Sequence, residues 1–172
     1  MNKIILQPGD IVLEDHHSKN KFIDFFLNIQ DWFDKGLFNH AMIGFDHNVC
    51  LEAGFQNVRF RRINTADPRF TVLRYKEKYD IELMKALIEK YAAEHDGYSY
   101  SGLVSAAIST MYWRLTGQKK QFFPDNKKPY CAELVAEIWE EFGLKLDINE
   151  NIITPNDLYR SSLFEVVKIG YY

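Results

Sequence analysis

The side chain in this sequence that is best suited to covalent chemistry is that of Cys131. It follows Pro129-Tyr130 and opens an apolar run, 131–142, with helical spacing, so we expect its thiol in the first turn of a helix. The positive end of a helix dipole and a nearby imidazolium both stabilise a thiolate, which is the nucleophilic form. An ordinary thiol, with a pKa of ~8.5, holds only a few per cent of that form at neutral pH. By position alone, a small buried cysteine at the base of a helix is the commoner interpretation.

His40 and Glu52 are the candidate partners of that thiol. His40 stands at the entry to the apolar run 41–45, where the end of a strand can hold an imidazole as general base. Glu52 lies in the next apolar run, 49–53, and a carboxylate there could orient the ring and stabilise its protonated form. Each has an ordinary alternative: a histidine that donates to a backbone carbonyl, and a strand residue that faces solvent. Together the three residue types indicate a Cys-His-Glu triad.

These residues need a strand pair and a helix to position them. The two apolar runs around Asp46-His47-Asn48 predict a β-hairpin that carries His40 and Glu52. Further strands are expected at 11–13, 57–63, 70–75 and 164–169, and helices at 21–38, 80–95, 101–115 and 131–142. Strands gathered mainly in the first half, with helices after them, predict an α+β domain in which a small antiparallel sheet packs against helices.

Composition limits the class of protein. With 172 residues, 47% of them hydrophobic and 15% aromatic, residues 1–172 are expected to form a single ordered domain. A net charge of −3 gives no reason to expect a nucleic-acid partner. No uncharged stretch approaches the ~20 residues of a membrane span, and the first ten residues hold too short an apolar run for a secretory signal. Two cysteines form no disulfide framework, so the cytoplasm is the expected compartment.

Six short segments extend the pattern along the chain. They are Pro8-Gly9-Asp10-Ile11-Val12-Leu13, Asn39-His40-Ala41-Met42-Ile43-Gly44-Phe45, Leu51-Glu52-Ala53, Asp96-Gly97-Tyr98-Ser99-Tyr100, Tyr130-Cys131-Ala132-Glu133-Leu134-Val135 and Ile153-Thr154-Pro155-Asn156-Asp157-Leu158. In this order they resemble the circularly permuted branch of the NlpC/P60 superfamily of papain-like cysteine hydrolases, close to the YiiX/YebB-like amidases. In that branch the histidine precedes the cysteine, as it does here. The resemblance runs from about residue 7 to 160.

The resemblance implies a fold, an activity and a set of site residues. The fold is the permuted papain-like α+β fold, and the site has Cys131 as nucleophile, His40 as base and Glu52 as the residue that orients the histidine. The implied activity is that of a cysteine amidase or peptidase without a cofactor. It would cleave an amide bond in a small peptide, a cell-wall-type peptide or an amino-acid conjugate through a thioacyl-enzyme. Tyr98 and Tyr130 would line the substrate pocket, or else pack around a helix start.

The sequence departs from the family at two places. Ser99 stands where relatives usually have an acidic residue, so substrate contacts there are expected to differ. The segment 16–38 is longer and more aromatic than the expected link before the histidine strand. Its helical spacing of aromatic residues would also suit a lipid surface or an acyl pocket. A thiol-dependent lipid acyl hydrolase or acyltransferase is therefore an alternative function, and a non-catalytic binding module on the same fold is another.

Two clusters of polar residues receive ordinary interpretations. His16-His17, beside two acidic residues, matches no zinc-ligand spacing and is expected to be a polar loop, so no metal is expected. Arg59, Arg61 and Arg62 form a basic cluster on a predicted strand. A solvated strand face is the expected setting, with docking of an anionic substrate group as the alternative.

Overall fold

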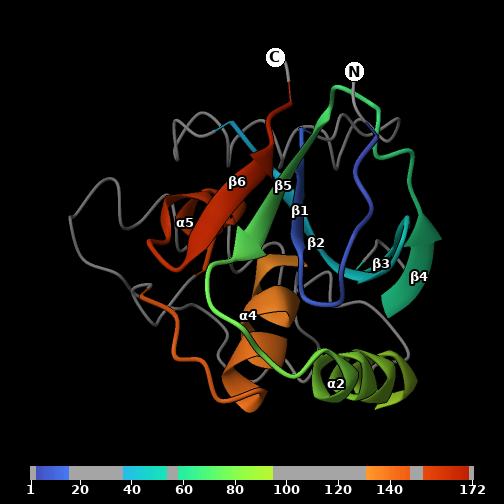
Figure 1. Cartoon of the computed structure of the whole chain (residues 1–172), viewed down its shortest axis with the longest axis vertical. Coiled ribbons are helices and arrows are strands. Elements are labelled where there is room, and N and C mark those ends of the chain that lie inside the picture. The colour runs from blue at the N-terminus through green and yellow to red at the C-terminus, as the bar shows by residue number, and fades with distance from the viewer. Residues whose placement is uncertain (1–2, 16–36, 54–57, 95–130, 148–152, 171–172) are drawn as a thin grey trace, which may run out of the picture.

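In the part of the chain that the structure describes, which is residues 3–15, 37–53, 58–94, 131–147 and 153–170, six strands form one antiparallel sheet. The structure is a computed structural model. The strand order is β4-β3-β2-β1-β5-β6 (Figure 1). The strands are β1 (Ile11–Glu14), β2 (His40–Asp46), β3 (Val49–Ala53), β4 (Val58–Arg62), β5 (Phe70–Tyr75) and β6 (Phe164–Lys168).

Three helices in these ranges pack on the sheet and on one another: α2 (Ile81–Glu94), α4 (Cys131–Glu141) and α5 (Pro155–Arg160). Helix α4 contacts β2 and β3, which are the strands expected to carry the histidine and the glutamate. Helix α2 contacts α4 and β4, and α5 contacts α4 and β1 (Figure 1). None of the helices in the described ranges has the length and apolar composition of a membrane span.

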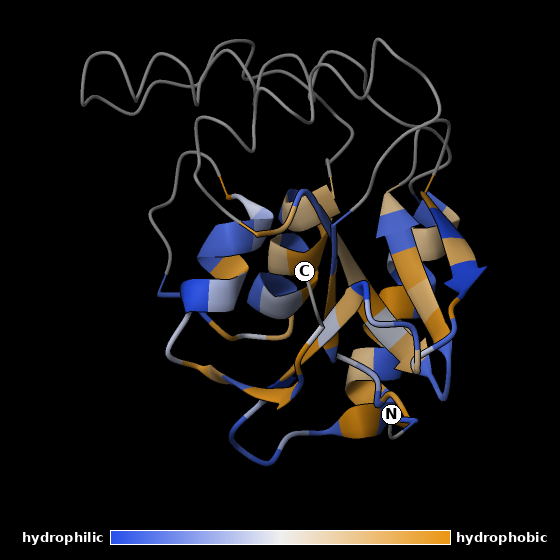
Figure 2. Cartoon of the chain, turned by 90° about the horizontal axis from the view of Figure 1, so that it is seen from above, coloured by the Kyte–Doolittle hydropathy of each residue, from blue (hydrophilic) through white to orange (hydrophobic). Residues whose placement is uncertain are grey.

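The sheet is buried on both faces near its centre. One face packs on α4, and its apolar side chains include Ile11, Leu13, Ile43 and Leu51. The alternating residues belong to a second cluster that includes Val12, Met42, Cys50, Phe70 and Val72. Because successive side chains of a strand point to opposite faces, both clusters together account for the full burial of β1. Figure 2 shows apolar strands in the middle of the sheet and a hydrophilic strand, β4, at its edge.

The expected α+β class is confirmed, as are the hairpin and the strands at the positions predicted. Helix α4 also starts at the predicted residue, and it ends where Gly143 adopts a φ of 100°, a conformation that glycine reaches without a steric cost. All six expected strands join this sheet, and β6 returns from the end of the chain to pair with β5. The predicted helices at 21–38 and 101–115 lie outside the described residues.

Helix α5 was not expected from the sequence. It has six residues, which is too few to show helical periodicity, and local capping starts it. The Thr154 hydroxyl accepts from the Asp157 backbone N–H, the Asp157 carboxylate accepts from the Thr154 backbone N–H, and Pro155 occupies the first turn. The capping box therefore fixes a helix that hydrophobic pattern alone does not reveal.

Candidate active site

The hairpin places His40 beside Glu52. Strands β2 and β3 pair with Ile43 opposite Leu51, so Glu52 lies diagonally across from His40 on the same face of the sheet. His40 Nε2 is 3.2 Å from Glu52 Oε2. Glu52 is buried, with only 2% of the residue exposed, so the alternative of a strand residue facing solvent is excluded. The carboxylate is in position to hold the imidazole ring.

Cys131 is the first residue of α4, and it meets His40 at the end of the sheet. Its thiol and the imidazole form a side-chain hydrogen bond. The backbone N–H groups of Ala41 and Ala132 also donate toward the sulfur. Helix α4 thus brings the cysteine to a histidine 91 positions earlier in the chain (131 − 40).

The electrostatics of this contact favour a thiolate–imidazolium pair. Burial alone raises the pKa of Cys131, but the hydrogen bond and the charge of His40 outweigh burial and hold it below that of an ordinary thiol. Burial alone lowers the pKa of His40, but its hydrogen bonds with Cys131 and Glu52 raise it from 6.5 to about 10. Both shifts stabilise the charged forms, and a thiolate beside an imidazolium can attack a carbonyl carbon.

Glu52 is kept ionised by three cationic or hydrogen-bonding neighbours. Arg59 Nε lies 2.9 Å from Glu52 Oε1, and Arg61 Nη1 lies 3.1 Å from Oε2, the oxygen that also faces His40. Burial alone raises the pKa of Glu52, but the hydrogen bond with His40, together with both arginines, lowers it to about 2. Of the predicted basic cluster, Arg59 and Arg62 are exposed as expected, whereas Arg61 turns inward to the site.

Asn156 is a site-supporting residue that sequence reasoning did not single out. Its side-chain oxygen accepts from the backbone N–H groups of Leu37 (2.8 Å) and Phe38 (3.2 Å), and its amide donates to the Phe38 carbonyl (2.8 Å). The residue is 3% exposed. Asn156 therefore pins the segment immediately before His40 to the start of α5. Only its place in the motif 153–158 hinted at a role.

Substitution Asn156→Ala is expected to destabilise the fold by roughly 2–4 kcal/mol, because it removes three hydrogen bonds to the Leu37 and Phe38 backbone, two of them buried. Urea unfolding followed by circular dichroism measures this free energy. Asn64→Ala is the matched control, since its side chain makes one exposed hydrogen bond, to the Ala66 backbone, and should cost less than about 1 kcal/mol. Equal stability of the two variants would contradict the anchoring role of Asn156.

The other residues singled out in the sequence either lie outside the described residues or lie in the core. Tyr98, Tyr130 and His16-His17 lie outside the described residues. Cys50 is fully buried in the second core cluster, where burial raises the pKa of its thiol far above the ordinary range, as suits an inert core cysteine.

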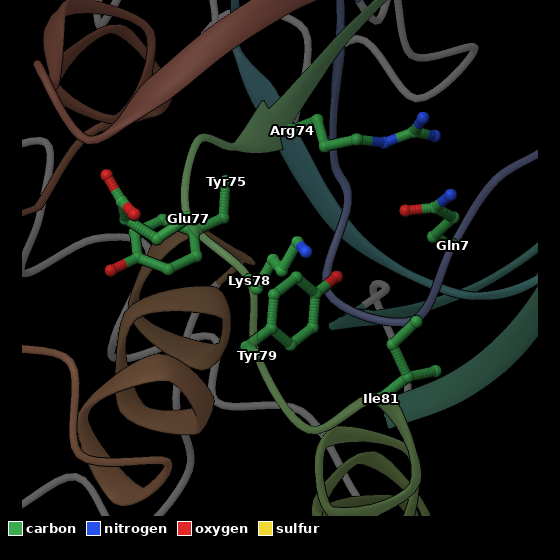
Figure 3. Close-up of a pocket in the computed structure, with 7 residues that line it drawn as sticks. All are labelled: Gln7, Arg74, Tyr75, Glu77, Lys78, Tyr79 and Ile81. Carbon is green, nitrogen blue, oxygen red and sulfur yellow. The ribbon is translucent and has the colours of Figure 1, made fainter.

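An open pocket of about 290 Å³ lies elsewhere, between β5 and the start of α2 (Figure 3). Its lining includes Gln7, Arg74, Tyr75 and Tyr79, but not Cys131, His40 or Glu52. The Arg74 guanidinium is held by Asp10, with two contacts of 2.8 Å. Because its strongest anion-binding group is already paired inside the protein, this pocket is not a candidate for the chemistry considered above.

The described residues form an α+β fold in which the sheet and helix α4 bring Cys131, His40 and Glu52 together. No protein-family model matches the chain, and no curated protein matches it in sequence. Its fold is similar to the crystal structure of the metalloprotein YiiX from Escherichia coli O157:H7, with a TM-score of 0.62. The match covers 96% of this chain and 98% of that chain at 13% sequence identity. Likeness at this identity establishes the fold.

The described residues do not fit a metal ion. Among them, no group of three or more His, Cys, Asp or Glu side chains could hold one. Although a histidine, a cysteine and a glutamate meet at the site, both oxygens of Glu52 accept from guanidinium groups, and these cations would repel a metal ion.

Proposed function

We propose that this protein is a cysteine hydrolase that cleaves an amide bond. Its substrate would be a small peptide, a cell-wall-type peptide or an amino-acid conjugate. Cys131 is the nucleophile, His40 the general acid and base, and Glu52 the residue that orients the imidazole. The observation that carries the proposal is that His40 contacts the thiol on one side and the Glu52 carboxylate on the other.

The reaction follows from these three groups. The Cys131 thiolate attacks the carbonyl carbon, and backbone N–H groups at the start of α4 stabilise the resulting oxyanion. The C–N bond then breaks as the His40 imidazolium gives its proton to the leaving nitrogen, which leaves a thioester on Cys131. Neutral His40 takes a proton from water, whose oxygen attacks the thioester. The acid is released, and the thiolate–imidazolium pair is restored.

The two alternative functions have less support from the described residues. The lipid acyl hydrolase hypothesis depends on the aromatic segment 16–38, which lies almost wholly outside the described residues. A binding module would not need a cysteine whose pKa is lowered by a neighbouring histidine, and a lowered thiol pKa at a helix start is typical of reactive cysteines. Amide hydrolysis is therefore the function we retain.

Trapping of the acyl-enzyme tests the proposal. The protein is mixed with a panel of small peptide amides, amino-acid conjugates and fatty-acyl esters. The reaction is quenched in acid, and the mass of the intact protein is measured by mass spectrometry. Acylation by an amide substrate, absent in Cys131→Ala and retained in Cys50→Ala, is the expected result. Adducts from fatty-acyl esters alone would move the assignment to the lipid hydrolase. No adduct and no turnover with any member would favour the binding module.

The pH dependence of hydrolysis should be bell-shaped. Activity should fall on the acidic side when the Cys131 thiolate becomes protonated. Because the pKa of Cys131 is lowered, this fall should occur at a lower pH than for an ordinary thiol. Above the pKa of His40, about 10, the imidazolium that protonates the leaving nitrogen is lost, so activity should fall only in strong alkali. A plot of kcat/KM against pH reports both limbs for the free enzyme. An alkaline limb near neutral pH would contradict the imidazolium form of His40.

A further inference from the structure

A single guanidinium joins two buried carboxylates behind the site. Arg61 Nη1 lies 2.8 Å from Glu14 Oε2 and 3.1 Å from Glu52 Oε2, while Nη2 lies 3.3 Å from Glu14 Oε1. The oxygen of Glu52 that Arg61 binds is the one that faces His40. The side chains therefore form a chain of contacts, from Glu14 through Arg61 and Glu52 to His40, that ends at Cys131.

Packing holds the Arg61 side chain in one place. Strand pairing puts Arg61 opposite Cys50, and thus on the face of the second core cluster. Its guanidinium lies 5.9 Å from the ring centre of the buried Phe70 and donates to the Met42 sulfur at 3.8 Å. The guanidinium is already held by the Phe70 ring and by Glu14, so it loses little further conformational freedom when it binds Glu52.

The positive charge of Arg61 balances the negative charges of Glu14 and Glu52. Glu14 is fully buried and lies opposite His40 in the strand register, so two carboxylates share this face of the sheet. The other nearby guanidinium groups are mostly in water: the Arg59 side chain is 60% exposed, and Arg69, 59% exposed, reaches Glu14 only at 3.9 Å. Arg61 is therefore the half-buried cation that contacts both carboxylates, in a setting where unpaired charge is costly.

We propose, resting on the function proposed above, that Arg61 is a positioning residue of this site. Its guanidinium holds the Glu52 carboxylate against His40 and balances the negative charge of the buried Glu14. Arg61 does not touch the reacting atoms. It acts through Glu52, by setting the orientation of that carboxylate and by balancing the negative charge behind the imidazolium.

Two substitutions with opposite effects on charge test this role. Arg61→Met removes the positive charge that balances Glu14 and Glu52, so the acid limb of Cys131 alkylation by iodoacetamide should move to higher pH. At about pH 6 the rate should fall by roughly tenfold. Glu14→Gln removes a negative charge and leaves the bond between Arg61 and Glu52, so it should leave the limb unchanged or move it to lower pH. The double variant should return toward the parent profile.

Among the described residues, the titratable and charged groups around Cys131 and its partners are Glu14 on β1, His40 on β2, Cys50 and Glu52 on β3, Arg59 and Arg61 on β4, and Arg69 before β5. Circular dichroism identifies the variants that fold. Should Arg61→Met not fold, Arg61→Lys keeps the charge without the two-pronged geometry and should shift the limb partway upward.

The outcomes separate this inference from the proposed function. A lowered Cys131 midpoint in the parent protein that neither Arg61→Met nor Arg61→Lys moves would overturn the positioning role and leave the hydrolase intact. The same shift with Glu14→Gln as with Arg61→Met would also overturn it, because a purely structural role predicts a common effect. A parent protein whose Cys131 titrates as an ordinary thiol would overturn the proposed function itself.

Discussion

Cys131→Ser is expected to reduce turnover of any amide substrate by at least about 10³-fold. The environment of this residue stabilises a thiolate beside an imidazolium, through His40 and the backbone N–H groups of Ala41 and Ala132. A serine hydroxyl remains protonated under the same conditions and would need a neutral base to remove its proton. The hydrogen bonds of His40 raise its pKa and keep the imidazole protonated, so it is a poor base for the serine hydroxyl. The loss should therefore appear in kcat as well as in kcat/KM.

Rates of product formation by liquid chromatography measure this effect for the parent and for the variant. Cys50→Ala is the matched control, because it removes the other cysteine from a buried position with no contact to His40 among those described. It should cost stability and leave the activity of the folded protein near the parent value. Activity in Cys131→Ser within tenfold of the parent would remove Cys131 from the mechanism.

His40→Ala should produce the second large effect, a thiol that no longer ionises near neutral pH. Without the hydrogen bond and charge of His40, burial is the dominant influence on Cys131, and burial raises the pKa of a thiol. The midpoint for alkylation of Cys131 should then lie at or above the ordinary value of ~8.5, and the rate at about pH 6 should fall at least tenfold. Hydrolysis should be lost together with alkylation.

A second histidine on the same hairpin supplies the control. His47 lies in the turn after β2, its side chain is 74% exposed, and its ring contacts Asp46 at 2.5 Å. Its φ of 39° is one that asparagine tolerates, so His47→Asn removes an imidazole without strain. That variant should alkylate like the parent. Equal rates for His40→Ala and the parent at about pH 6 would show that His40 does not activate the thiol.

The strands and the hairpin were predictable because their apolar residues alternate or run together at the spacing that a buried sheet requires. Helix α4 was predictable from its helical spacing and the glycine at its end. The candidate site residues were chosen for their residue types, for the places of His40 and Cys131 at the starts of predicted elements, and for their places in six ordered segments. Contact between Cys131 and His40 was an expectation of the resemblance, since nothing in local spacing brings residues so far apart in the chain together.

The supporting residues could not be predicted in the same way. Glu14, Arg61 and Glu52 come from three strands, and they meet only through the strand order β4-β3-β2-β1 and its register. In the sequence, Arg61 is one of three arginines on a strand, and nothing in the spacing shows that it is the least exposed of them. The contacts of Asn156 span 118 residues. Such contacts depend on tertiary structure, which hydrophobic periodicity does not encode.

The pH dependence of Cys131 alkylation in the unmodified protein tests the central claim most directly. Iodoacetamide is added over a series of pH values, and peptide mass spectrometry separates modification of Cys131 from that of the buried Cys50. A thiolate–imidazolium pair predicts a midpoint for Cys131 clearly below that of an ordinary thiol, with Cys50 unmodified while the protein is folded. A Cys131 midpoint at ~8.5 or above would mean that His40 and Glu52 do not activate the cysteine.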